Sequence, residues 1–368
     1  MTDHAVFAPS GLSRIVACPG HRNLYAKAKA QGLLLDETQT PWAMEGDAAD
    51  YVATDRLEGV LHQAGELAPN GVMIDGDMID GAELWLDSLR PYRGEGELIQ
   101  ADLHMAMIHA NCRGRLDYGR VANGLVFVPE YKYGHRFVDV FELWQAIAYA
   151  LGACPSYLPS MRILLMVVQP RSYHRDGPVR TWELSYEKLH AYGKMLHLAC
   201  IASEDPDAEC IVTPECYKCP TRHVCEAAQR AELSAFELAG STEPLNMSPA
   251  AKALRLRQIR RAADHLKQMD GGLTEDITSV IRAGGSVPGW TMQSSAGREV
   301  WIEAKRNEVP FLGQMFGADV TKPGLVTPNQ ARKMGVPVEG YSERRPGEFK
   351  LVEADTSLFA RNFIIEGE

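Results

Sequence analysis

The chain has 368 residues, of which 45% are hydrophobic and 23% charged, as in ordinary globular proteins of one large or two domains. No uninterrupted apolar run approaches the roughly 20 residues that cross a membrane, which argues against a membrane protein. The net charge of −10 disfavours a protein that coats nucleic acid non-specifically, but is compatible with an enzyme that has a local basic groove.

The N-terminal stretch "MTDHAVFAPSGLSRIVACPG" has no basic region followed by an apolar run, so it does not predict secretion. We therefore expect a cytoplasmic protein. In that compartment its eight cysteines would serve as thiols or metal ligands rather than as disulfides.

The predicted elements follow one another in an order typical of a sheet covered by helices. Pro41 is favoured at a first helical turn, so a helix is expected to begin near Thr40-Pro41. In chain order the patterns predict helices over 36–61 and 80–96, a strand over 96–109, a hairpin over 114–134, a helix over 141–155, a buried strand over 161–171 and a helix over 185–205. This order predicts the α/β class with a mixed sheet.

The hairpin, "GRLDYGRVANGLVFVPEYKYG", is centred on Asn123-Gly124, the strongest short signal for a type I′ turn. A two-residue loop places Asp117 directly opposite Glu130, with their Cβ atoms about 4.5–5.5 Å apart. Lys132 shares the face of Glu130, because side chains alternate along a strand. Two like charges at that distance are unfavourable, so a divalent cation between the carboxylates is one interpretation.

An ordinary surface hairpin is the alternative interpretation of these residues. Lys132 and Arg115 would then neutralise the two acids without any metal. Pro129 also interrupts the second strand, and a bulge there would change the register.

Three cysteines in "PECYKCPTRHVCEAA" form a Cys216-x2-Cys219-x5-Cys225 pattern that suits a thiophilic centre. Cys18 is the candidate fourth ligand, and Cys210 competes with it. Four thiolates suit either a [4Fe–4S] cluster or a tetrahedral Zn²⁺ ion. Such a centre would staple the N-terminal segment to the region that follows the sheet, and its loss would loosen the domain.

Residues beyond the cysteines predict a second, accessory domain. We expect one domain over 1–240 and a smaller α+β domain over 248–368, joined by a linker around "STEPLNMSPAAK". A helix over 250–269 is rich in Lys and Arg. It predicts either a solvated face with an inward Leu/Ile stripe or a surface that contacts DNA.

Four elements together resemble the RecB-type PD-(D/E)XK nucleases over roughly residues 10–230. They are Asp117 in "GRLD", the E-x-K of Glu130 to Lys132, the Q-x-x-x-Y of Gln145 and Tyr149, and the arrangement of the cysteines. E-x-K alone is non-specific, whereas the ordered set is fairly specific. One cysteine before the core and three after it resemble the iron–sulfur subgroup, which includes the CRISPR-associated RecB-like exonucleases and the nuclease domain of AddB. The whole chain also resembles an uncharacterised phage-encoded family with a C-terminal extension.

The resemblance implies a restriction-endonuclease-like sheet and a role for each matching residue. Asp117, Glu130 and the carbonyl of Tyr131 would bind Mg²⁺ or Mn²⁺, and Lys132 would polarise the attacking water. Where the subgroup has a histidine in G-x-x-x-H, this chain has Asp50 after Gly46. Asp50 is a harder ligand that favours Mg²⁺, and Glu45 is an alternative.

The resemblance also implies a DNA-contacting surface, for which the candidates are Gln145, Tyr149, Arg115 and Arg136. We therefore predict a metal-dependent deoxyribonuclease, expected to act as an exonuclease in phage-type recombination, replication or DNA processing. Its partners would be DNA and, as a further candidate, a phage recombination or single-strand-binding protein; self-association is left open. The alternatives are a nuclease-fold module that binds DNA or a partner with little cleavage, and a zinc-stapled structural protein.

Overall fold

The computed structural model describes residues 7–34, 41–154, 161–172, 174–240, 247–294, 299–321, 325–344 and 349–353. Packing divides the chain into two compact units, residues 1–273 and 274–368. The first unit therefore includes the start of the long helix that the sequence analysis assigned to the accessory domain. Thr40 and the first half of the expected linker, residues 241–246, lie outside the described residues.

The first unit is built on a five-stranded mixed sheet with the strand order β1-β2-β3-β4-β5. Neighbouring strands are antiparallel except for β3 and β4, which are parallel. The strands are β1 (Glu97–His104), β2 (Arg113–Ala122), β3 (Leu125–Tyr131), β4 (Arg162–Val168) and β5 (Val179–Ser185). The predicted α/β class with a mixed sheet is confirmed; β5 was not predicted.

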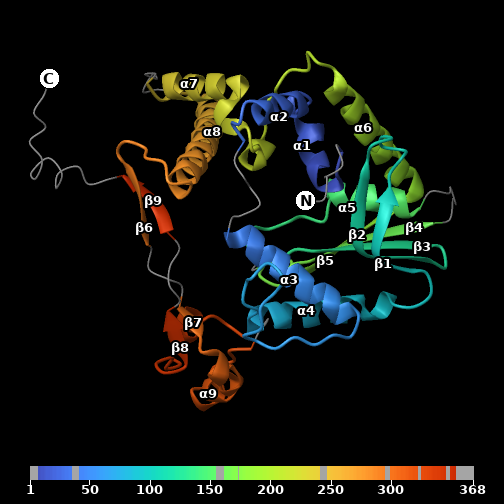
Figure 1. Ribbon diagram of the computed structural model, residues 1–368, viewed down its shortest axis with the longest axis vertical. Coiled ribbons are helices and arrows are strands. Elements are labelled where there is room, and N and C mark those ends of the chain that lie inside the picture. The colour runs from blue at the N-terminus through green and yellow to red at the C-terminus, as the bar shows by residue number, and fades with distance from the viewer. Residues whose placement is uncertain are drawn as a thin grey trace, which may run out of the picture. The chain divides into compact units, whose positions relative to one another are not determined.

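Helices cover both faces of this sheet (Figure 1). On one face lie α3 (Pro41–Leu57) and α4 (Gly76–Leu89), and on the other α5 (Trp144–Ala153) and α6 (Tyr186–Glu204). Side chains of β4 alternate between the two cores: Ile163 and Leu165 face α5 and α6, whereas Met166 faces α3 and α4. Burial on both faces explains the near-continuous apolar run of this strand.

Two predicted helices differ in where they begin or how they are capped. The helix expected over 80–96 begins at Gly76, because the Asp75 carboxylate caps it by accepting from the Met78 amide at 3.0 Å, and it ends at Leu89. The helix expected over 185–205 spans Tyr186–Glu204. Its N-terminus is capped by the Ser185 hydroxyl, which accepts from the Lys188 amide at 3.3 Å.

The Asn-Gly hairpin has the predicted turn. Asn123 and Gly124 have φ angles of 52° and 73°, and Ala122 pairs with Leu125 across them. The hydrogen-bonded register between β2 and β3 continues to Arg120↔Phe127 and ends short of Asp117 and Glu130. Proline in β3 has no N–H to donate, which is consistent with a ladder that ends near it.

The N-terminal helices α1 (Leu12–Ala17) and α2 (His21–Ala30) lie against the cysteine-containing segment. The Gly20 amide donates to the Glu209 carbonyl at 3.1 Å. This segment contains η4 (Pro214–Lys218) and η5 (Arg222–Val224), and α7 (Glu226–Gly240) follows it. Arg222 donates to the carbonyl of Gln268 at 3.2 Å, so the middle of α8 (Pro249–Arg282) packs on the same region.

The expected inward stripe of α8 is wrong for its first half. Leu254, Leu256 and Ile259 are exposed, and burial begins only further along, at Met269. The reason is that the contacts with Arg222 reach only the later turns, at Gln268 and Gly272. The helix is capped by the Ser248 hydroxyl, which accepts from the Ala251 amide at 3.2 Å.

The described residues of the second unit form the end of α8, short helices and two two-stranded sheets. Its core is formed by residues from across the unit, among them Trp301, Val309 and Val338. The elements are β6 (Trp290–Ser294) with β9 (Phe349–Glu353), β7 (Glu299–Trp301) with β8 (Ser342–Arg344), η6 (Glu303–Glu308), α9 (Val309–Met315) and α10 (Pro328–Lys333). Across the described ranges of both units, none of the helices combines the length and apolarity needed to cross a bilayer.

Replacing Gly20 by alanine should destabilise the first unit. A Cβ at this position would lie 2.6 Å from the Cys210 amide nitrogen, so backbone would have to shift. We expect Gly20→Ala to lower the free energy of unfolding by about 1–3 kcal/mol. Gly46→Ala is the control: its Cβ meets nothing within 4 Å inside α3, and it should stabilise by about 0.5–1 kcal/mol. Urea denaturation of both variants measures the difference, and equal effects would contradict the close approach.

Candidate functional site

Three carboxylates from three different elements lie near one another beside the sheet. Asp50 comes from α3, Asp117 from β2 and Glu130 from β3. Burial, followed by the charges of Asp50 and Glu130, raises the pKa of Asp117 to about 8. Burial, followed by the charge of Glu130, raises the pKa of Asp50 to about 6. The structure thus brings together three acids that are far apart in the sequence.

Lys132 is the cation of this group. Its Nζ lies 2.6 Å from Glu130 Oε1 and 3.1 Å from Gln145 Oε1, to both of which it donates. The Glu130 side chain is only 4% exposed, so solvent screens this ion pair little. Burial lowers the pKa of Lys132, but the charges of Glu130, Asp117 and Asp50 outweigh burial and raise it overall. Lys132 therefore stays protonated, and all three carboxylates interact with its charge.

The charges of this group do not balance. One ammonium faces three carboxylates, which would carry an excess of negative charge if all were ionised. Burial is the main cause of the raised pKa values of Asp117 and Asp50, and the repulsion between the carboxylates adds to it. Oxygen donors with surplus negative charge suit a hard cation such as Mg²⁺ or Mn²⁺. We call Asp50, Asp117, Glu130 and Lys132 the carboxylate site.

Glu45, the alternative acidic ligand, points elsewhere. Its carboxylate pairs with Arg171 at 3.0 Å, and the Arg171 guanidinium lies over the Tyr133 ring at 4.5 Å. Of the two acids on α3, Asp50 is therefore the one that interacts with Glu130 and Asp117.

Helix α5 supports the site through two residues one turn apart. Gln145 accepts from Lys132, as described above. Tyr149 is 7% exposed, and its hydroxyl donates to the Arg115 carbonyl of β2 at 2.8 Å. Both side chains therefore make contacts inside the protein, and their predicted contact with DNA stays a prediction.

The other two predicted DNA-contacting residues are exposed arginines. Arg115 pairs with Asp102 at 3.4 Å. Arg136 lies over the ring of Tyr217 at 3.2 Å. Because Tyr217 belongs to the cysteine segment, this stacking joins the loop after Lys132 to that segment.

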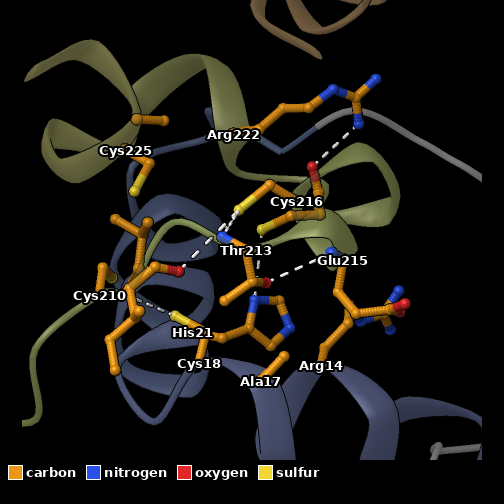
Figure 2. A pocket seen from close by; sticks show the side chains of 14 residues that line it. Arg14, Ala17, Cys18, His21, Cys210, Thr213, Glu215, Cys216, Arg222 and Cys225 are labelled. Atoms are coloured by element: carbon orange, nitrogen blue, oxygen red, sulfur yellow. Dashed lines mark hydrogen bonds between the residues drawn. The ribbon is translucent and has the colours of Figure 1, made fainter. Parts of the chain in front are cut away.

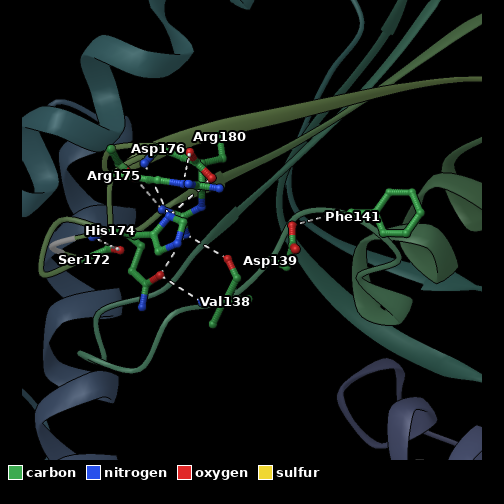
Figure 3. A network of polar contacts seen from close by, with 10 residues as sticks. Val138, Asp139, Phe141, Ser172, His174, Arg175, Asp176 and Arg180 are labelled. Atoms are coloured by element: carbon green, nitrogen blue, oxygen red, sulfur yellow. Dashed lines mark hydrogen bonds and ion pairs between the residues drawn. The ribbon is translucent and has the colours of Figure 1, made fainter. Parts of the chain in front are cut away.

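A buried network that sequence reasoning missed holds this loop. Gln169 is fully buried at the end of β4, and its Nε2 donates to the carbonyls of Gly134 and Arg136, each at 2.6 Å. Arg180 donates to Gln169 Oε1 at 2.8 Å and to the Val138 carbonyl at 2.9 Å. Figure 3 shows Arg180 beside Val138 in this network. Glutamine directly after a buried apolar strand was the signal that could have indicated it.

Tyr131, the predicted carbonyl ligand, pairs with Val168 of β4, and its side chain lies on the far face of the strand. Its ring packs against Trp85 in the core with α3 and α4. Alternation along β3 places this ring opposite to Glu130, as the sequence predicts.

Five cysteines line one cavity of about 30 Å³ between α1, α2 and the segment that follows α6 (Figure 2). Four are the predicted set, Cys18, Cys216, Cys219 and Cys225, and the fifth is Cys210. The Ile211 amide donates to Cys18 Sγ at 3.3 Å, across 193 positions of sequence. The Thr213 amide donates to Cys216 Sγ at 3.3 Å. The fold therefore assembles the thiols that the spacing singled out.

Cys210 lies between two of these thiols. The pKa values of Cys18 and Cys225 are both lowered to about 6, mainly by hydrogen bonds with Cys210. The thiolate is the form that binds metals, so this arrangement favours ligation. Cys112 and Cys200 are fully buried in the core, as expected of incidental cysteines.

Within the described stretches of the chain, no group of three or more His, Cys, Asp or Glu side chains is arranged so that it could hold a metal ion. The thiols line one cavity, and the acids are close enough to shift one another's pKa values. In neither set do the side chains point at one common position. The nature of any bound metal therefore stays a prediction.

Residues 4–334 match the family described as "Protein of unknown function (DUF2800)". The chain belongs to this family. The matched range of the DUF2800 protein contains the carboxylate site, the cysteine-lined cavity and most of the second unit. Both candidate sites therefore lie within a single family match.

The metal-free DUF2800 protein should lose stability as pH rises from about 5 to about 8. The folded pKa values of Asp117, about 8, and Asp50, about 6, exceed the ordinary value of roughly 3.9, so folding favours the protonated forms. That stability is complete below the unfolded pKa and is lost as pH passes the folded values. Thermal unfolding in EDTA across this range measures it.

Asp117→Asn is the control for this pH dependence, since it removes the group that titrates highest. It should flatten the profile between pH 6 and pH 8. Equal stability of the metal-free wild type at pH 6 and pH 8 would contradict the assigned charge imbalance.

Proposed function

We propose that this DUF2800 chain is a Mg²⁺- or Mn²⁺-dependent deoxyribonuclease of the RecB type, with a restriction-endonuclease-like arrangement of its sheet. The observation that supports the proposal most is the carboxylate site. Three acids from a helix and two strands share a single lysine, Lys132, which is itself held by Glu130 and Gln145. An ordinary surface hairpin would not require buried acids with raised pKa values.

In this proposal each residue has a defined role. Asp50, Asp117 and Glu130 would hold the cation, together with the carbonyl of Tyr131. The bound cation would neutralise the scissile phosphate and stabilise the leaving oxygen. Lys132 would position the attacking water and offset the negative charge that develops on the phosphate. Gln145 would keep the ammonium in place.

The acids would repel one another if all were ionised, and a bound cation would offset that repulsion. The side chains of Asp50 and Asp117 can rotate about two bonds and that of Glu130 about three, so binding would bring their oxygens onto one ion. Asp50 in the place of the subgroup's histidine gives an all-oxygen donor set, which would favour Mg²⁺.

DNA binding by a chain of net charge −10 would depend on local positive charge. Arg115 and Arg136 are exposed, and Arg136 belongs to the loop that Gln169 clamps. A fixed loop next to Lys132 would present its arginine to the phosphate backbone at low entropic cost. The process served would be recombination, replication or DNA processing of the phage type.

A second proposal concerns the cysteine-lined cavity, which we infer to hold a [4Fe–4S] cluster. A single Zn²⁺ requires all its sulfur ligands within about 2.3 Å of one point. Cys18, Cys216, Cys219 and Cys225 line one cavity, and a [4Fe–4S] cluster takes one thiolate at each of its four irons. Backbone amides that donate to Cys18 and Cys216 would stabilise the ligated sulfurs.

Cleavage of DNA tests the enzymatic proposal. Linear and circular DNA, each single- and double-stranded, would be incubated with Mg²⁺ or Mn²⁺. We expect Asp117→Ala, Glu130→Ala and Lys132→Ala each to lower the rate at least about 100-fold. Glu183→Ala, which alters an exposed acid of the same sheet that pairs with Arg162, should act like wild type. Equal cleavage by wild type and Lys132→Ala would overturn the mechanism, and DNA binding without cleavage would favour a binding module.

Metal analysis of protein purified without oxygen tests the cluster proposal. We expect iron, acid-labile sulfide and a broad visible absorption. These should be lost in Cys216→Ala, Cys219→Ala and Cys225→Ala, and retained in Cys112→Ala. Comparing Cys18→Ala with Cys210→Ala identifies the fourth ligand, for which we expect Cys18. A colourless protein with stoichiometric zinc would instead support a structural metal.

A further inference from the structure

Strand β1 is locally distorted opposite the carboxylate site. On either side of Gln100 the register with β2 is regular, with Ile99↔Tyr118 and Ala101↔Leu116. By the same register Gln100 stands opposite Asp117, but its φ angle is 47°. The left-handed region is unfavourable for any residue with a Cβ, and glutamine is not among the residues that tolerate it. Such a conformation persists only where surrounding contacts hold it.

The contacts of Gln100 show what holds it. Its carboxamide interacts with the Asp117 carboxylate and lowers the pKa of that acid, against the larger opposing effect of burial. Its Nε2 also donates to Thr54 Oγ1 at 3.3 Å. Thr54 lies on α3 four residues after Asp50, so the two share one face of that helix. One side chain therefore connects the strand that carries Asp117 to the helix that carries Asp50.

We propose that Gln100 is a positioning residue that fixes Asp117 on β2 relative to Asp50 on α3 for cation binding. The carboxamide suits this task, because a neutral donor satisfies a carboxylate without adding charge to an already unbalanced site. A lysine or arginine there would form an ion pair with Asp117 and compete with the cation. The inference rests on the proposed function, since it assumes that the two acids bind one cation.

A purely structural role for Gln100 predicts a different response to mutation. Glycine adopts a positive φ without steric cost, so Gln100→Gly relieves the backbone while it removes the carboxamide. If Gln100 served only the fold, this variant would be neutral or stabilising and nothing else would change. If it positions Asp117, the variant should fold at least as well and bind the cation less well.

Binding of Mn²⁺ to the full-length protein, followed by electron paramagnetic resonance, tests the inference. Wild type should bind Mn²⁺ at a site that Asp117→Ala abolishes. We expect Gln100→Gly to raise the apparent Kd at least about tenfold, as loss of a residue that orients a metal ligand typically does, with an unchanged or higher Tm. Thr54→Val should weaken binding in the same direction, and Thr54→Ser, which keeps the hydroxyl, should restore it.

The outcomes separate this inference from the proposed function. Wild-type affinity in Gln100→Gly, at a site that Asp117→Ala still abolishes, would overturn the positioning role and leave the proposed function standing. Wild type without any Mn²⁺ site that depends on Asp117 would overturn both. Weaker binding by Gln100→Gly and Thr54→Val, with rescue by Thr54→Ser and unimpaired folding, would establish the role.

Discussion

The imbalance of charge around Lys132 is the constraint on which the rest of the structure depends. A single ammonium, 2.6 Å from Glu130, faces three carboxylates in a place where burial weakens the screening by solvent. Burial raises the pKa of Asp117 and of Asp50, and repulsion from the neighbouring carboxylates raises both further. Keeping these like charges together costs the fold stability, and such clusters of perturbed acids are frequent at functional sites.

The elements around this site restrict its movement. Helix α5 holds Lys132 through Gln145 and holds β2 through Tyr149. The Gln169–Arg180 network fixes the loop that follows Lys132. Through that loop, Arg136 stacks on Tyr217, which lies between Cys216 and Cys219. The carboxylate site and the cysteine-lined cavity are thus mechanically connected, and a centre that orders the cysteine segment would also steady the loop beside the acids.

Several features could be predicted from the sequence because local chemistry determines them. The Asn123-Gly124 turn follows from two positions that need positive φ, and the cap of Ser185 follows from one side chain and one amide. The apolar run of β4 follows from its burial on both faces. Two features were not predicted correctly. Strand β5 was not predicted at all, and helix α4 begins earlier than expected, at Gly76, because Asp75 caps it.

The sequence by itself singled out the residues that we propose to carry the chemistry, namely the E-x-K strand, the acid before the turn, and the spaced thiols. Only the tertiary structure decided which of them meet. The choice of Asp50 over Glu45, the central place of Cys210, and the link from Gln100 to both Asp117 and Thr54 all depend on packing between segments distant in the chain. Local patterns determine the backbone conformation and the face of the element on which a side chain lies. Which residue from a distant segment packs against that face depends on how the whole core is buried.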